Sequence, residues 1–113
     1  MYFFSKRSKK HVIRKHFYSH NKNVSLFFSK KFILDIPQTV FMITRLFHVQ
    51  LRQNKILILY RHGKYIGFAP NRIPTEYFTV ICDKITSEII TTFPVNLGNY
   101  HFLSRVCLKL LVM

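Results

Sequence analysis

Four consecutive residues in the middle of the chain, Arg61-His62-Gly63-Lys64, have the clearest potential for chemistry. Cationic side chains next to a glycine, which allows a tight turn, could hold a phosphate group between them. Arg72, in the Pro-containing loop that follows, could add a fourth cation. We therefore predict a phosphate-binding turn made by Arg61, His62, Lys64 and Arg72. The alternative is a solvated basic turn whose long side chains splay apart.

Apolar runs on both sides of this turn predict a β-hairpin at the centre of the fold. With residues 62–63 as the loop, Leu57 would pair with Phe68 on one face, and Tyr60 would meet Tyr65 on the other. A glycine at the second loop position suits the positive φ of a hairpin turn. The hairpin face that carries Leu57 is expected to be buried under a helix.

The tripeptide Arg61-His62-Gly63 after an apolar strand resembles the opening motif of the histidine phosphatase and phosphoglycerate mutase family. The resemblance implies a phosphate-handling enzyme with a larger α/β domain, in which His62 is the nucleophile and Arg61 and Arg72 bind phosphate. The match covers about a dozen residues, Lys64 replaces the acid usual in the mutases, and 50 residues follow Gly63. A nucleophilic histidine also needs oriented partners. We therefore expect no enzyme, with the phosphatase as the least favoured alternative.

The charge balance indicates a polyanionic partner. The 113 residues include 18 Lys and Arg but only 4 Asp and Glu, so the net charge is +14. Four acids cannot neutralise this surface, which repels itself unless a polyanion is close. We predict binding to nucleic acid, with RNA favoured, and no cofactor; an anionic membrane surface is a second possible partner, and a merely basic protein is the remaining alternative.

Residues 1–34 differ from the rest of the chain because they contain nine Lys or Arg and no acid. A run of like charges does not support an isolated helix. We predict a basic, flexible and partly disordered N-terminal arm over 1–34, followed by a small domain over 35–113. A transit peptide and an ordinary basic tail are the alternatives for the arm. The cations of the arm assigned to RNA are Lys6, Arg7, Lys9, Lys10, Arg14 and Lys15.

Aromatic residues interleave with the cations of this arm. Tyr18 lies between Lys15 and Lys22, and Phe28 comes just before Lys30. Single-stranded nucleic acid is bound by this combination of cations for phosphates and rings for bases. An interfacial membrane anchor would use the same residue types, and burial of Phe residues between 24 and 34 in a strand or helix is a further alternative.

No metal site or disulfide is expected. His16 and His20 are four residues apart, which would place them on one face of a helix, but no carboxylate or Cys lies near them in sequence. Cys82 and Cys107 are 25 positions apart with no CxxC pair. We predict that both are reduced and buried.

Spacing of apolar residues predicts a helix over 37–53. Asp35 is a possible capping residue, and Pro37 suits a first helical turn. The apolar positions recur at steps of three and four from Ile36 onward. On the other side of this helix, Arg45, Arg52 and Lys55 would form a cationic stripe along which a phosphate backbone could lie.

The remaining segments complete an α+β domain. We predict a loop over 69–75, a third strand over 77–82, a turn over 94–99 and a helix over 101–113. Residues 83–93 are ambiguous, and helix is favoured over strand. The fold class is thus a small single α+β domain, in which a central β-hairpin and a third strand are packed by two or three helices.

No run of 18 apolar residues and no secretory signal occur, so we expect no transmembrane span and favour an organellar (mitochondrial) or cytoplasmic location. The function predicted is phosphate neutralisation with little base specificity, as in a protein of an organellar ribosome. The strongest alternative is a reading frame of an AT-biased genome with no selected function, since Gly numbers 3 and Phe 12.

Overall fold

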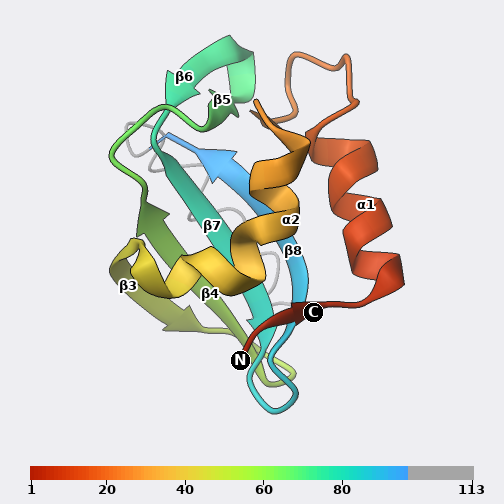
Figure 1. Cartoon of the computed structure of the whole chain (residues 1–113), viewed down its shortest axis with the longest axis vertical. Helices are drawn as coiled ribbons and strands as arrows, with labels where there is room; N and C mark the ends of the chain where they lie inside the picture. Colours follow the sequence, from red (N-terminus) through yellow and green to blue (C-terminus); the bar gives the residue numbers. More distant parts are fainter. Residues whose placement is uncertain (97–113) are drawn as a thin grey trace.

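A five-stranded sheet forms the centre of the computed structural model, which describes residues 1–96 (Figure 1). Each pair of neighbours is antiparallel except the first, which is parallel. The strands, in their order across the sheet, are β1 (Phe3–Phe4), β8 (Glu88–Val95), β7 (Tyr77–Asp83), β4 (Lys55–Arg61) and β3 (Thr44–Gln50).

A second, three-stranded antiparallel sheet lies at one end of the first (Figure 1). Its strands, in order, are β2 (Leu26–Phe27), β5 (Gly67–Ala69) and β6 (Ile73–Thr75). The helices are α1 (Lys6–His16), α2 (Lys30–Thr39) and two 3-10 turns, η1 (Val40–Met42) and η2 (Pro70–Arg72). Helices α1 and α2 pack on the same face of the large sheet (Figure 1). The predicted α+β fold class is confirmed.

Strand β4 is buried on both faces. Ile58 and Tyr60 pack into the cluster beneath α1 and α2, whereas Leu57 and Leu59 pack with Ile81 into a second cluster on the opposite face. A central strand needs apolar side chains at consecutive positions, since neither face meets water. The uninterrupted run over 56–60 therefore suits the middle of the sheet.

The predicted pairing of the hairpin is wrong. Strand β4 pairs with β3 and β7, so Leu57 lies opposite Val49 and Ile81. Residues 67–69 belong to the other sheet, and Tyr65 is exposed while Tyr60 is buried. Two seven-residue partners give β4 more backbone hydrogen bonds than a three-residue strand could. The positive φ expected at the turn glycine is confirmed, at 93°.

The helix predicted over 37–53 is also wrong in both its start and its end. Helix α2 begins seven residues earlier, where the Ser29 side chain accepts a hydrogen bond from the Phe32 N–H at 3.1 Å. Pro37 lies inside the helix, and Asp35 pairs with Lys31 rather than capping. After η1 the chain turns into strand β3, because pairing with β4 outweighs the local helical spacing.

Of the remaining segments, one agrees with expectation and three differ. The strand predicted over 77–82 is confirmed as β7. Residues 83–93 form a turn and most of β8 rather than a helix, and β8 ends at Val95, two residues into the turn predicted over 94–99. The loop predicted over 69–75 contains η2 and the short strand β6. The helix predicted over 101–113 lies outside the described residues.

Residues 1–34 contain β1, α1, β2 and the first half of α2. Helix α2 continues across residue 34. Helix α1 has one buried face: Ser8, Val12 and His16 recur every four residues and are buried against the sheet. Tertiary burial stabilises a helix that its charges alone would not.

Candidate nucleic-acid interface

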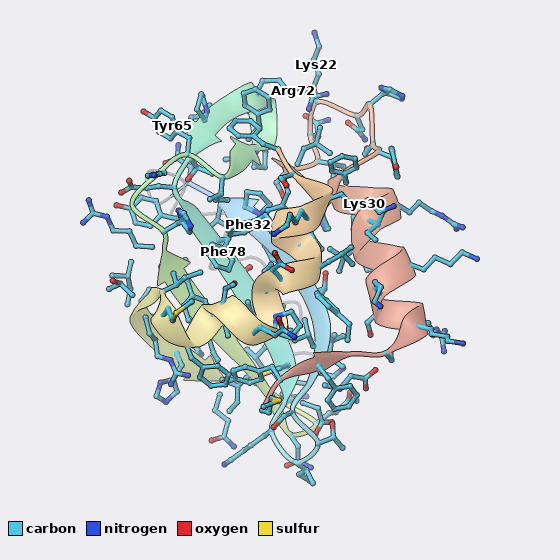
Figure 2. The ribbon with its side chains drawn as sticks, in the orientation of Figure 1. Lys22, Lys30, Phe32, Tyr65, Arg72 and Phe78 are labelled. Atoms are coloured by element: carbon cyan, nitrogen blue, oxygen red, sulfur yellow. The ribbon has the colours of Figure 1, made fainter. Side chains whose placement is uncertain are left out.

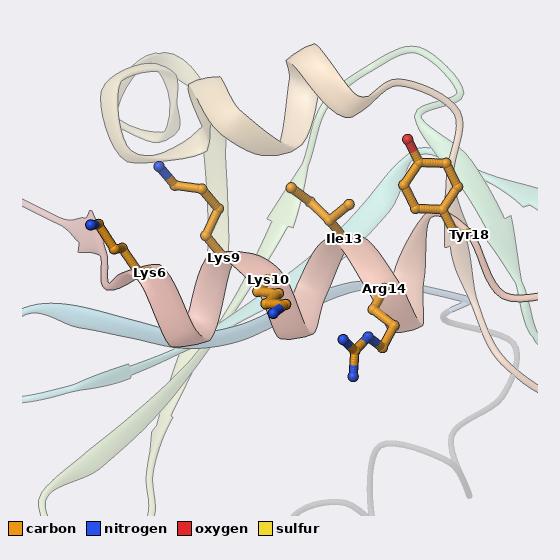
Figure 3. A pocket seen from close by; sticks show the side chains of 6 residues that line it. All are labelled: Lys6, Lys9, Lys10, Ile13, Arg14 and Tyr18. Carbon is orange, nitrogen blue, oxygen red and sulfur yellow. The ribbon is translucent and has the colours of Figure 1, made fainter.

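Helix α1 carries the densest group of cations among the described residues. Because residues four apart share a helical face, Lys6, Lys10 and Arg14 lie in one row on the exposed side of α1. Figure 3 shows Lys9 and Ile13 on a neighbouring side of the same helix and Tyr18 just beyond its carboxyl end. A shallow depression of about 440 Å³ is lined by Lys6, Lys9, Lys10, Ile13, Arg14 and Tyr18. We call the α1 cations Lys6, Arg7, Lys9, Lys10, Arg14 and Lys15 the α1 basic surface.

The local sequence explains why α1 forms despite this charge. The Ser5 side chain caps the helix by accepting a hydrogen bond from the Ser8 N–H at 3.1 Å. Arg14 and Lys15 near the carboxyl end suit the helix dipole. The first turn contains no acid, so its cations oppose the dipole there. The helix thus keeps a charge placement that lowers its stability unless an anion is nearby.

All four acids of the chain lie among the described residues, and each is engaged locally. Asp35 pairs with Lys31 at 3.0 Å and Glu76 with Arg61 at 2.6 Å. Asp83 accepts two backbone N–H groups of its own turn, and Glu88 accepts the Ser8 hydroxyl at 3.3 Å. Within residues 1–96, no ion pair joins an acid to the α1 basic surface.

His16 ends α1 and is a structural residue. Its Nδ1 donates to the Ser25 carbonyl at 2.9 Å, and its ring stacks on Phe93 with centroids 5.5 Å apart. The pKa of His16 is lowered to about 4, mainly by burial and to a smaller extent by the nearby Lys15 and His11, while the hydrogen bond to Ser25 opposes the shift. His20 is exposed in the loop beyond the helix, so the two histidines share no helical face.

The predicted phosphate-binding turn is not assembled as expected. Arg61 already donates its Nε–H to Glu76, and the backbone N–H of His62 donates to the Glu76 carbonyl at 2.9 Å. The His62 ring meets the edge of Phe32 at 5.3 Å beside a depression of about 330 Å³. Lys64 is exposed in the following loop and does not lie opposite Arg61, which pairs with Tyr77 and Thr44.

The predicted cationic stripe is wrong because the helix that would carry it does not form. Arg45 lies near the start of β3, where it donates to the Tyr2 hydroxyl at 3.4 Å, and a hydrogen bond to Tyr60 raises its pKa. Arg52 lies in the turn beyond the other end of β3, and Lys55 is opposite Asp83. Three residues predicted on one face are therefore divided between the two ends of a strand.

Arg72 belongs to a different group, at the three-stranded sheet. Its guanidinium carbon lies 5.9 Å from the centre of the Phe68 ring, and Phe68 meets Phe28 edge to face at 4.9 Å. The Asn71 N–H donates to the Lys22 carbonyl at 2.8 Å. Figure 2 shows Lys22 and Arg72 together at this end of the molecule. We use the name aromatic–cationic patch for this group, Lys22, Phe28, Phe68 and Arg72, together with Lys30, which is exposed two residues after Phe28 in the first turn of α2.

This patch contains residues that the predicted set of phosphate ligands omitted. The sequence shows Phe28 before Lys30, which signals a mixture of ring and charge. Nothing in the local sequence brings Phe28 to Phe68, because that contact depends on the pairing of β2 with β5. The sequence therefore named Lys22, Phe28, Lys30 and Arg72, but in two separate patterns, and Phe68 in neither of them.

Comparison of the chain with protein-family models, with curated proteins and with solved structures finds no match. Among the described residues, no helix is long and apolar enough to cross a membrane.

Proposed function

We propose that this protein binds RNA through the α1 basic surface, as a component of a larger assembly and without catalysing a reaction. The observation that carries the proposal is the set of six cations on one helix, none of which is paired with an acid within residues 1–96. Each phosphate neutralised by such a cation releases a condensed counterion, which favours binding at low salt.

The geometry favours contacts to the nucleic-acid backbone over reading of base edges. Lysine is a flexible point charge, and four of the six cations are Lys. Contacts of this kind position a partner without specifying its sequence. We therefore expect comparable affinity for RNAs of different sequence at equal length.

The test compares two sets of substitutions with the same change in charge. Lys6→Gln, Lys10→Gln and Arg14→Gln remove three cations from the α1 basic surface. The matched control removes the exposed cations of three loops, by the substitutions Arg52→Gln, Lys64→Gln and Lys84→Gln. The affinity for a labelled RNA is measured by fluorescence anisotropy over a range of salt concentrations.

We expect the α1 triple variant to bind RNA more weakly. The plot of the logarithm of the association constant against the logarithm of the salt concentration should also become less steep by about 2, because each phosphate contact to a single strand contributes about 0.7 to its steepness. The control triple should keep most of the affinity and the slope. Equal losses in both variants would show that the attraction depends on net charge alone. Binding insensitive to salt, or no binding, would refute the proposal.

A further inference from the structure

Phe28 presents an aromatic ring to solvent from a backbone that is held in place. Phe28 is 49% exposed, one of several large apolar residues that remain exposed among residues 1–96. Its N–H donates to the Ile66 carbonyl at 2.9 Å, and the next residue, Ser29, caps α2. The hydrogen bond and the cap fix the chain on both sides of the ring.

A second ring and a guanidinium support Phe28 from the neighbouring strand. Phe68 meets Phe28 edge to face at 4.9 Å, and Arg72 lies against the Phe68 ring. Asn71 and Arg72 have positive φ angles of 68° and 59°, which non-glycine residues rarely adopt. From this backbone the Arg72 guanidinium reaches the face of Phe68, and the Asn71 N–H donates to the Lys22 carbonyl, so the backbone of Lys22 lies beside Asn71.

The charges around the rings all have the same sign. Lys22 and Lys30 are exposed, and Arg72 is half-buried. The four acids of the chain are engaged with Lys31, Arg61, the β7–β8 turn and Ser8, so none neutralises these three cations. An exposed ring within a cationic surface suits a ligand with both a flat π face and negative charge. A nucleotide base with its phosphates has both.

We infer that the aromatic–cationic patch binds single-stranded nucleic acid, with one base stacked on Phe28 and the flanking phosphates bound by Lys22, Lys30 and Arg72. This inference rests on the proposed function and specifies its ligand. A base within a duplex is already stacked on its neighbours, and only an unpaired base exposes its face to a protein ring. The patch therefore discriminates between single strands and duplexes, whereas the α1 basic surface attracts both.

The experiment uses the full chain and two labelled RNAs of about ten nucleotides, an oligouridylate and a blunt duplex, since a single binding module covers about that length. Three variants of one position separate stacking from packing. Phe28→Ala removes the ring, Phe28→Leu keeps an apolar side chain without a ring, and Phe28→Tyr keeps the ring. The matched control is Phe41→Ala, because Phe41 is an even more exposed ring, at 64%, that stacks on Tyr2 near the other end of α2.

We expect Phe28→Ala and Phe28→Leu to bind oligouridylate about tenfold more weakly, in line with the loss of one stacked base. Affinity for the duplex should stay unchanged in both, and Phe28→Tyr and Phe41→Ala should bind both RNAs like the unaltered protein. Circular dichroism shows whether each variant is folded. An oligodeoxythymidylate of the same length tests whether the 2′-hydroxyl contributes.

Several outcomes would overturn the inference, and they differ from failure of the proposed function. If Phe28→Leu retains full affinity for oligouridylate while binding stays dependent on salt, the stacking site is refuted and the α1 proposal survives. If neither RNA binds in a salt-dependent way, both proposals are refuted. Binding to vesicles of anionic phosphatidylglycerol that depends on Phe28, without binding to oligouridylate, would assign the patch to a membrane surface instead.

Discussion

The buried imidazole of His16 makes folding stability depend on pH in a defined window. Burial lowers the pKa of His16 to about 4 from its ordinary value of 6.5. The unfolded chain therefore binds a proton as the pH falls through 6.5, while the folded chain keeps His16 neutral until the pH approaches 4. Because the unfolded state takes up more protons, stability falls as the pH is lowered across this window.

The size of the effect follows from the shift. Each pKa unit corresponds to about 1.4 kcal/mol, so the full difference is about 3 kcal/mol. Almost none of it is lost at pH 7, about 2 kcal/mol is lost by pH 5, and the rest is lost near pH 4. A small domain has a total stability of about 5 to 15 kcal/mol, so this single side chain should dominate the pH profile above the range of the carboxylates.

Urea unfolding at pH 7, 6 and 5, followed by far-ultraviolet circular dichroism, measures this dependence; the chain has no Trp for fluorescence. His16→Gln removes the proton site and leaves a side-chain amide that can donate to the Ser25 carbonyl. We expect this variant to lose most of the pH dependence between 7 and 5. The control is His20→Gln, which replaces an exposed histidine of the following loop. A profile that stays equally steep in His16→Gln would refute the assignment.

Other predictions concern the turns and caps that position the two surfaces. Gly67→Ala should destabilise the fold by about 3 kcal/mol, because the added Cβ would collide with the Leu26 backbone. Gly63→Ala should destabilise it by about 1 kcal/mol, because of the positive φ at that position alone. Chemical denaturation measures both changes. Ser5→Ala removes the cap of α1 and should lower the stability of that helix by about 1 kcal/mol. Amide hydrogen exchange of the helix would measure this loss. Asp83→Ala should lower the melting temperature at pH 7. Backbone hydrogen bonds from Thr86 and Ile85 lower the pKa of Asp83 below its ordinary value, so the difference between the variant and the parent should persist down to that ordinary value and disappear as the pH falls through the lowered pKa. An unchanged melting temperature at pH 7 would contradict this role.

Sequence patterns predicted elements well where the local signal agreed with the tertiary partner. The strand at Tyr77–Asp83 is rich in β-branched and aromatic residues and is central in the sheet. The same pattern in β4 was assigned to a strand correctly but paired with the wrong neighbour. A pattern of apolar residues predicts that a segment is a strand within a sheet. It does not predict which strands pair with it when several apolar segments compete.

Tertiary contacts decide the structure of two segments. Residues Thr44–Gln50 show helical spacing of apolar side chains, and yet β3 forms because the adjacent β4 offers seven residues of antiparallel pairing. In α1, burial of Val12 stabilises a helix that the run of charge alone does not favour. In both segments packing between elements outweighs the local propensity, which is worth only a few tenths of a kcal/mol per residue.

For the candidate sites, the composition indicates a class of ligand, but it does not indicate where in the fold the binding residues lie. The cations of α1 were identified from the charge run alone, and the structure adds that they lie on one helix. The aromatic–cationic patch depends on a contact between Phe28 and Phe68, 40 residues apart. The cationic stripe failed because its geometry was derived from a helix that does not exist. A site can be read from sequence only as far as the element that carries it is known.

Comparison of the two triple variants separates a selected binding protein from an unselected basic chain, and the cations at the helix starts show why the comparison is needed. Lys6 and Arg7 occupy the first turn of α1, and Lys30 and Lys31 occupy the first turn of α2, where positive charge opposes the helix dipole. Selection for stability alone would favour acids at these positions. A composition biased against acids would place cations there by chance, and in that case the two triple variants described above should lose RNA affinity equally. An unequal loss requires that the position of the charges, and not only their number, matters to the partner.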